Sequence, residues 1–490
     1  MAASNRPAGS VDMTTALAPY NGPWNQRLAA HLLRRAGFGG TPDEIARIAR
    51  MRPGGAVESL IHFPSTAQLP QPENVFDPYA AGILPFARPG MIRPGAMVDQ
   101  TARQQLLMDV RRRSRDSIIS LQQWWLQRML TTPAPLQEKM TFYFHGHFTT
   151  AAIQKAVWPS YVYQQNQLFR NYALGNLREL TRNVSKDPAM LLYLDNATSV
   201  AAHPNENYAR ELMELFTLGH GNYSEQDIRE SARAFTGWTI DRRTGQFMDV
   251  ARIHDDGLKH FLGRTGNFTG DNIVDIIFEQ PAAARFFATG LLNFFAYNDP
   301  EPALVNNVAA LLRKNDFNLA PVLSRLFRSN VFYSDRAYRA LVKSPVEFVV
   351  GSYKLFGLSQ IDAAAQRALV QMGQVLFYPP NVAGWPGGSA WLTTQMMIAR
   401  ENFATALTNS PAMASSTWLT NVPMSAPQAT RDLIRTILQN DASAASIAKV
   451  QNYLNGVNTS ALGMLSGENY QERVRGAAYL TMAMPAYQLN

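Results

Sequence analysis

The second half of this 490-residue chain is dominated by helical periodicity, and this feature constrains the fold most strongly. Apolar side chains recur at α-helical spacing in one segment after another, and the turns between the segments are short. The expected helices cover about 271–278, 281–294, 300–313, 319–328, 340–356, 361–375, 392–408, 426–439, 443–455 and 468–483. Such a pattern predicts a mainly α protein, a large helical bundle or array.

The first half also has helical patterns, but proline and glycine interrupt them. Seven prolines between His62 and Met97 prevent any long helix there and predict a long irregular loop. Alternating polar and apolar residues at about 239–250 predict a small β-hairpin. We therefore expect one compact body with three parts: a flexible lead-in at 1–25, an N-terminal helical half at 26–270 that carries the candidate site, and a C-terminal helical half at 271–490.

Charge and composition exclude several classes of protein. The net charge of +8 is mild for this length, and the basic residues are scattered, so we expect no nucleic-acid partner. The absence of cysteine excludes disulfides and cysteine-based metal sites. No run of apolar residues is long enough for a membrane span, and the N-terminus lacks the apolar stretch of a signal peptide.

The segment 205–219 is the strongest candidate for a chemical site. On a helical wheel, Asn207, Glu211 and Glu214 share one narrow arc beside an apolar face that includes Tyr208 and Phe216. Two carboxylates one turn apart, at the edge of the buried apolar face of a helix, repel each other. One of them must therefore take up a proton, or the pair must bind arginines or a cation. Their spacing alone does not decide among these outcomes.

Two other segments carry groups that such a site would need. His145 and His147 are two residues apart, so on a helix they would point in different directions, whereas on an extended segment they would face one side. The alternative is that one is a hydrogen-bonded core histidine and the other is exposed. The segment 377–391 is an aromatic loop, in which Pro-Pro and Gly-Gly pairs prevent a helix.

Several motifs in the same order resemble those of the bacterial domain-of-unknown-function 1800 family, over nearly the whole chain. They are His31–Phe38, His145–Phe148, Asp187–Met190 with Leu194 and Asp195, Asn205–Gly219, Asn222–Asp227, Phe235–Trp238, and Tyr378–Asn381 with Trp385–Gly388. The resemblance implies an exported, periplasmic or secreted protein and supplies candidate positions, but it implies no reaction. Those positions are His147, Asp195, Glu206, Arg210, Glu211 and Glu214.

Four hypotheses fit these residues. Our preferred one is a carboxylate-dependent hydrolase that acts on an extracytoplasmic polymer such as a glycan, with or without a metal. In the second, His145 and His147 with Glu211 and Glu214 bind a divalent metal. In the third, the acids form a structural ion network with Arg210, Arg182 or Arg233. The fourth is a non-catalytic glycan-binding or cell-surface assembly protein.

The predicted site residues follow from the preferred hypothesis. The catalytic candidates are Glu211, Glu214, Asp195 and Glu206. The substrate-binding candidates are Asn207, Arg210, Trp238, Tyr378, Trp385 and Trp391.

Overall fold

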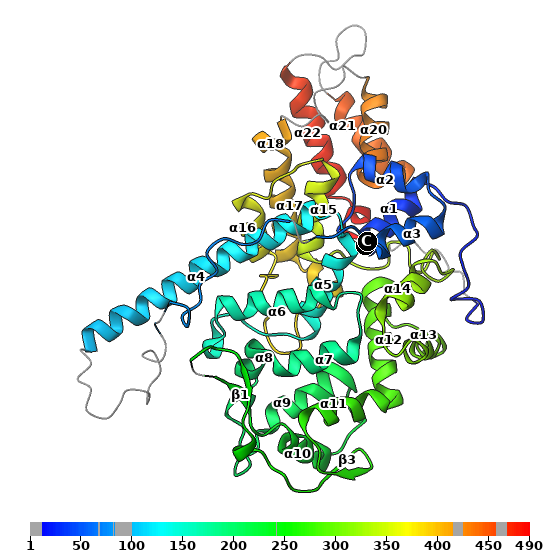
Figure 1. Ribbon diagram of the computed structural model, residues 1–490. Coiled ribbons are helices and arrows are strands. Elements are labelled where there is room, and N and C mark those ends of the chain that lie inside the picture. Colours follow the sequence, from blue (N-terminus) through cyan, green and yellow to red (C-terminus); the bar gives the residue numbers. More distant parts are fainter. Residues whose placement is uncertain are drawn as a thin grey trace.

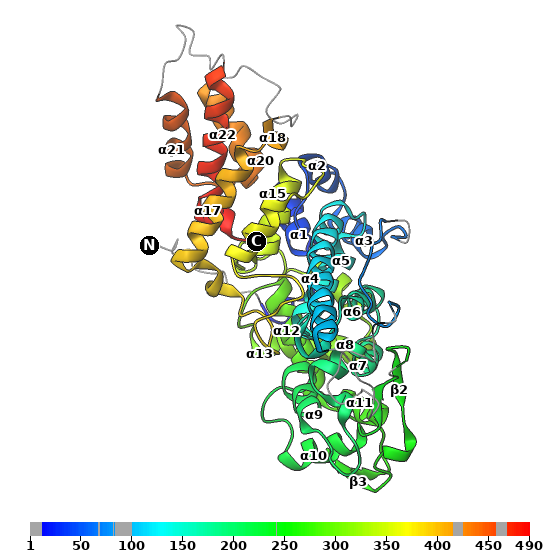
Figure 2. The ribbon, with the colours of Figure 1, turned by 90° about the vertical axis from the view of Figure 1, so that its left-hand side faces the viewer.

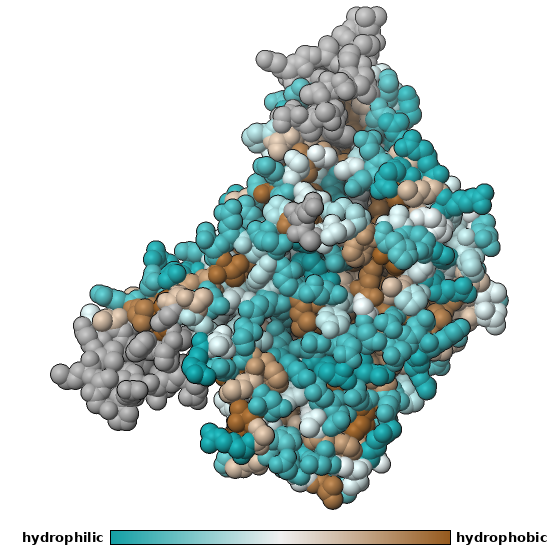
Figure 3. All heavy atoms as spheres, viewed as in Figure 1, coloured by the Kyte–Doolittle hydropathy of each residue, from teal (hydrophilic) through white to brown (hydrophobic). Residues whose placement is uncertain are grey.

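The computed structural model describes residues 12–66, 69–81, 83, 100–241, 243–414, 425–456 and 468–490. Helices make up most of it, which confirms the predicted mainly α fold (Figure 1). Within the described residues, no helix combines the length and the apolar character that crossing a bilayer requires. Hydrophilic residues cover most of the face in Figure 3, and the hydrophobic patches on it are small and scattered.

The N-terminal half contains ten α-helices among the described residues. They are α1 (Gln26–Arg35), α2 (Pro42–Ala49), α3 (Pro53–Ile61), α4 (Gln100–Thr131), α5 (Pro135–His147), α6 (Pro159–Asn171), α7 (Leu177–Lys186), α8 (Pro188–Tyr193), α9 (Glu206–Glu211) and α10 (Glu225–Ala234). Several begin at a proline in the first turn, where its missing N–H is not needed. The expected capping boxes of Thr41 with Glu44 and of Ser224 with Asp227 are both present.

The C-terminal half follows the predicted succession of helices. They are α11 (Gly270–Glu279), α12 (Pro281–Phe295), α13 (Pro302–Lys314), α14 (Leu319–Phe327), α15 (Pro345–Leu355), α16 (Ala363–Gln371), α17 (Thr394–Thr408), α18 (Pro411–Ala414), α20 (Ala426–Leu438), α21 (Ala444–Asn455) and α22 (Glu468–Met482). Helices α17, α20, α21 and α22 lie at one end of the molecule, and α9, α10 and α11 lie at the other (Figures 1 and 2). Helices α5 and α12 lie between these ends.

The predicted hairpin is present, and a second one follows it. Strands β1 (Trp238–Ile240) and β2 (Phe247–Asp249) pair antiparallel, with Ile240 opposite Phe247. Strands β3 (Lys259–Phe261) and β4 (Arg264–Gly266) form a hairpin that the sequence analysis did not predict. Short segments of one turn also occur: η1 (Gln154–Ala156), η2 (Asn196–Thr198), η4 (Ala251–Ile253), η5 (Gly388–Leu392) and η6 (Pro485–Gln488).

A buried charged cluster joins α4, α5 and α6. Glu138 on α5 is fully buried and accepts hydrogen bonds from the Nε atoms of Arg128 on α4, at 2.5 Å, and Arg170 on α6, at 2.7 Å. Its second oxygen accepts from Arg170 Nη2 at 2.9 Å and from Trp125 Nε1 at 3.1 Å. Because every carboxylate oxygen is paired, this cluster fixes the position of α5.

The described part of the lead-in lies against the body of the protein. Ala16 is fully buried, and Tyr20 donates its backbone N–H to the carbonyl of Arg328 at 2.7 Å. Residues 1–11 of the predicted lead-in, and residues 67, 68, 82 and 84–97 of the predicted proline-rich loop, lie outside the described residues.

Candidate functional site

The acidic segment begins as the predicted helix and continues as a wider one. The side chain of Asn205 caps α9 by accepting from the N–H of Asn207 at 2.9 Å. From Leu212 to Thr217 the backbone is a π-helix (η3), a form that is rare and frequent at functional sites. Tyr208 and Phe216 are buried, as predicted for the apolar face, whereas Glu211 and Glu214 are half-buried at its edge.

The carboxylates of Glu211 and Glu214 are partly exposed to solvent, and their surroundings include a tyrosine and no arginine ion pair among the described residues. Glu214 accepts a hydrogen bond from the hydroxyl of Tyr223 at 2.8 Å, and His220 Nε2 lies 3.4 Å from its other oxygen. Burial and then the charge of Glu214 raise the pKa of Glu211 above its ordinary value. No arginine in the described part of the chain lies within ion-pair distance of Glu211 or Glu214.

The predicted ion network is therefore wrong in its partners. Arg210 forms two hydrogen bonds with Glu225, at 2.8 and 2.9 Å, and lies 3.7 Å from Glu206. Arg182 pairs with Glu179, Asp271 and Asp275, and Arg233 pairs with Glu230 and Asp255. These arginines form ion pairs with other acidic residues, and the sequence pattern did not predict those pairings.

Asp195 and Asn207 lie near the same surface without joining the two glutamates. Asp195 has a left-handed backbone, with φ of 60°, and its carboxylate accepts from Lys155 at 2.6 Å. Asn207 is exposed, and its amide donates to the carbonyl of Leu194 at 3.3 Å. Among the described residues, neither side chain hydrogen-bonds to Glu211 or Glu214.

His145 is a core residue at the C-terminal end of α5. Its Nε2 accepts a hydrogen bond from the N–H of Phe377 at 3.0 Å, and its ring packs against Trp125 and Trp385 at centroid distances of 5.1 and 5.4 Å. Burial lowers the pKa of His145 to about 3. The ring is therefore neutral and serves as an internal acceptor that fixes the start of the aromatic loop.

His147 points in a different direction from His145, because helix α5 includes both histidines and residues two apart on a helix lie on different sides. Its Nε2 donates to the carbonyl of Phe216 at 2.9 Å, and its ring stacks on Tyr143 at 5.7 Å with an interplanar angle of 18°. Burial lowers the pKa of His147 to about 4. Over the described residues, no three histidine or carboxylate side chains cluster closely enough to hold a metal ion, so the geometry does not support the metal hypothesis.

The aromatic loop docks on the end of α5 through close backbone contacts. Gly384 has φ of +81°, and a Cβ atom there would lie 2.5 Å from the carbonyl oxygen of Gly146. Thr149 donates its hydroxyl to the carbonyl of Val382. Only glycine fits at position 384, and its conformation places Trp385 beside His145.

A pocket of about 410 Å³ lies where this loop meets α5, α12 and the start of α15. Three predicted site residues line it: His147, Trp385 and Trp391. The other lining side chains that matter here are Tyr143, Asn293, Asn298, Ser344, Glu347 and Gln374. Its volume falls within the usual range of small-molecule sites, so we take it as the candidate functional site.

The remaining predicted residues lie outside this pocket. Trp238, the first residue of β1, is buried in edge-to-face contact with Phe235 and Phe247 and is a core residue. Tyr378 is half-buried in the aromatic loop. The acidic residues Glu206, Glu211, Glu214 and Asp195 are also absent from the pocket lining. None of these four carboxylates therefore lines the pocket with His147 and the two tryptophans, although His147 contacts the acidic segment through the carbonyl of Phe216.

Three buried polar atoms on pocket-lining residues have no hydrogen-bond partner among the residues that the structure describes. They are the hydroxyl of Tyr143, Oδ1 of Asn293 and Nε1 of Trp385. An unpaired buried donor or acceptor costs about 1–3 kcal/mol, so a water molecule or a ligand group is the expected partner. Two donors and one acceptor are therefore available around a single cavity.

Glu347 is the acidic residue of the pocket, and the sequence analysis did not predict it. It accepts from the N–H of Ser344 at 2.7 Å in a capping box, and its other oxygen pairs with the buried ammonium of Lys139. Burial raises the pKa of Glu347, but the charge of Lys139 outweighs this and lowers it below the ordinary value. The Ser-Pro-x-Glu pattern is visible in the sequence, although it indicates only a helix start.

A family model described as protein of unknown function (DUF1800) matches residues 31–489. Searches of the curated proteins and of the solved structures found no match. The family match spans the motif His31–Phe38, the acidic segment 205–219 and the aromatic loop 377–391, in agreement with the resemblance seen in the sequence. The chain therefore belongs to the DUF1800 family.

Proposed function

We propose that the pocket between α5, α12 and the aromatic loop binds a neutral, polyhydroxylated ligand such as a sugar unit of an extracytoplasmic glycan. The observation that carries this proposal is the combination of two tryptophans with amide side chains around one cavity of about 410 Å³. Indole rings cover the apolar face of a sugar, while the amides of Asn293, Asn298 and Gln374 suit its hydroxyl groups.

The charge state of the pocket also favours a neutral ligand. His147 is uncharged at neutral pH, because burial lowers its pKa to about 4. The charge of Glu347 is balanced by Lys139. The unpaired atoms of Tyr143, Asn293 and Trp385 would exchange hydrogen bonds with hydroxyl groups, which both donate and accept.

Isothermal titration calorimetry with soluble oligosaccharides of neutral hexose and N-acetylhexosamine units tests this proposal. Trp385→Ala should weaken binding at least tenfold, because it removes the stacking surface. Trp158→Ala is the matched control, since Trp158 is also half-buried, has an unpaired indole N–H and lies outside the pocket. Equal losses in the two variants, or no binding to any sugar of the panel, would reject the proposal.

A carboxylate-dependent hydrolase centred on the acidic segment is the second candidate. It is favoured by the raised pKa of Glu211, because a carboxyl group that keeps its proton longer suits a general acid. Glu211→Gln should then abolish turnover of a polymer substrate without lowering the melting temperature. Full activity in Glu211→Gln would eliminate this candidate.

A further inference from the structure

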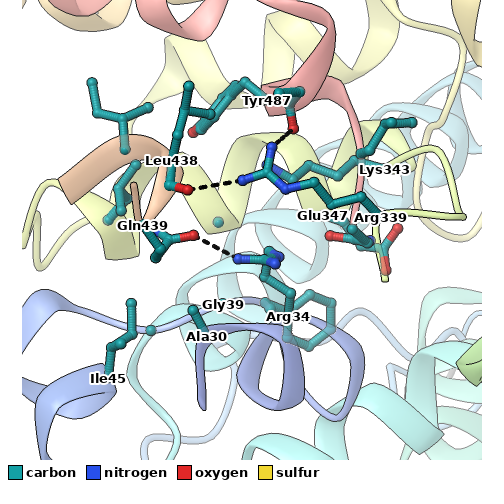
Figure 4. Close-up of a pocket in the computed structure, with 18 residues that line it drawn as sticks. Ala30, Arg34, Gly39, Ile45, Arg339, Lys343, Glu347, Leu438, Gln439 and Tyr487 are labelled. Atoms are coloured by element: carbon teal, nitrogen blue, oxygen red, sulfur yellow. Dashed lines mark hydrogen bonds between the residues drawn. The ribbon is translucent and has the colours of Figure 1, made fainter. Parts of the chain in front are cut away.

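A second cavity lies between α1, α15 and the C-terminal helices, and its lining is unusually basic. It measures about 40 Å³, room for roughly three water molecules. Arg34 on α1, together with Arg339 and Lys343 from the segment before α15, lines it. Arg34 and Arg339 point toward one another across it (Figure 4).

Two of the three cations, Arg34 and Lys343, form no ion pair with a carboxylate among the described residues, whereas Arg339 is paired with Asp441. Arg34 donates Nη1 to the side chain of Gln439 at 2.7 Å, while its Nε and Nη2 have no hydrogen-bond partner in the described parts of the chain. Arg339 donates to the carbonyls of Leu438 and Ala486 and is 3.0 Å from Asp441. The ammonium of Lys343 lies 3.8 Å from the ring centre of Tyr487.

The basic charge extends beyond the cavity wall. Arg35 and Arg400 are also buried near Arg34 and Lys343. In the described part of the chain, none of Arg34, Arg35, Lys343 and Arg400 forms an ion pair with a carboxylate. Glu347 also lines the cavity, but it is paired with Lys139.

Buried charges without a counter-charge are expensive, and proteins normally pair them. Arg34 is 9% exposed and Lys343 is 7% exposed, so water does not compensate them fully. Burial and then the charge of Arg339 lower the pKa of Arg34 to about 10, so this side chain is still charged at neutral pH. Burial and then the charge of Arg34 lower the pKa of Lys343 well below its ordinary value.

We propose that this cavity binds one small free oxoanion, of the class of phosphate or sulfate. The anion would accept hydrogen bonds from the free guanidinium donors of Arg34 and would place a negative charge beside Arg34 and Lys343, neither of which is paired with a carboxylate in the described part of the chain. The site would join α1 to the C-terminal helices, since its ligands come from segments that are far apart in the sequence. It adjoins the aromatic pocket, with which it shares the lining residue Glu347, but its three cations do not line that pocket, and it does not depend on sugar binding.

Titration calorimetry of the full chain with inorganic phosphate and with sulfate, in chloride buffer at constant ionic strength, tests the proposal. We expect one site per chain. Lys343→Met should weaken binding at least tenfold, whereas the control Lys314→Met, which removes an exposed lysine of α13, should leave it unchanged. Trp385→Ala should also bind phosphate normally, which separates this site from the sugar proposal.

Thermal unfolding distinguishes an anion-binding role of Lys343 from a purely structural one. The wild-type melting temperature should rise by several degrees in phosphate, because a ligand of the folded state stabilises it. In buffer without oxoanions, Lys343→Met should be at least as stable as wild type, since it removes an unpaired buried charge. Arg34→Gln provides the same test if Lys343→Met does not fold.

Three results would overturn the proposal. The first is the absence of binding for both phosphate and sulfate. The second is wild-type affinity in both Lys343→Met and Arg34→Gln. The third is binding of a hexose phosphate without binding of inorganic phosphate, which would show that the cavity does not hold a free ion.

Discussion

Replacement of Glu138 by glutamine should be one of the most destabilising single changes that keep side-chain volume. Glu138 is fully buried and compensates Arg128 and Arg170, both about 95% buried. Glutamine removes the charge and turns an NH₂ donor toward guanidinium donors. Breaking a buried ion pair in this way costs about 3–5 kcal/mol, because it leaves uncompensated charge in the interior.

The expected change in melting temperature follows from the size of the chain. An unfolding entropy of about 2.1 cal/mol/K per residue gives roughly 1 kcal/mol/K for this length. A loss of 3–5 kcal/mol therefore corresponds to a fall of about 3–5 °C when the chain unfolds as one unit. Differential scanning calorimetry measures this directly, and urea unfolding at an unchanged slope should show the same loss.

The difference in stability between wild type and Glu138→Gln should depend on pH, which provides a further check. Burial raises the pKa of Glu138, but the hydrogen bonds and charge of Arg170 outweigh it and lower the pKa below its ordinary value of 4.5. The stabilisation is then complete above pH 4.5 and is lost as the pH falls through the lowered pKa. Wild type and Glu138→Gln should therefore converge in acid.

A matched surface change serves as the control. Asp109 pairs with Arg112 at 2.7 Å on the exposed side of α4, so Asp109→Asn should leave the melting temperature unchanged. A fall of less than 1 °C in Glu138→Gln, or an equal fall in Asp109→Asn, would refute the reasoning that the cluster holds α5 in place.

Two further predictions concern the loop and the core. Gly384→Ala should cost about 1–3 kcal/mol and displace Trp385, because its Cβ would meet Gly146 and φ is positive; normal sugar binding and normal stability in this variant would contradict it. Asp187 has a pKa raised to about 7 by burial, so its contribution to stability is present at low pH and is lost as the pH rises from 3.8 toward 7. Asp187→Asn should therefore be more stable than wild type at pH 8, by up to about 4 kcal/mol, and similar at pH 4, as measured by urea unfolding.

The fold was largely predictable from local signals. Helical periodicity and helix caps identify most helices, and Thr41 with Glu44 form the predicted capping box. The second hairpin was missed because its first strand begins inside the polar segment 254–260, and because its turn places Leu262, a residue type that rarely adopts it, at positive φ beside Gly263. Such a short pairing depends on contacts with α10 and carries no periodic pattern of its own.

The candidate site was predictable only in part. The sequence indicated His147, Trp385 and Trp391, which the structure brings to one pocket. It did not indicate that Glu347 would join them in place of Glu211, because contacts between helices far apart in the chain leave no local spacing. The basic cavity was not predicted for the same reason, because its cations come from α1 and from residues after 330.

The most direct test of the central claim is ¹⁹F NMR of the full chain labelled with 5-fluorotryptophan. The eight tryptophans give eight signals, which single Trp→Phe variants assign. On addition of a saturating oligosaccharide, we predict shifts of the signals of Trp385 and Trp391, with those of Trp158 and Trp238 unchanged. Shifts confined to tryptophans outside the pocket, or no shift with any sugar of the panel, would contradict the account.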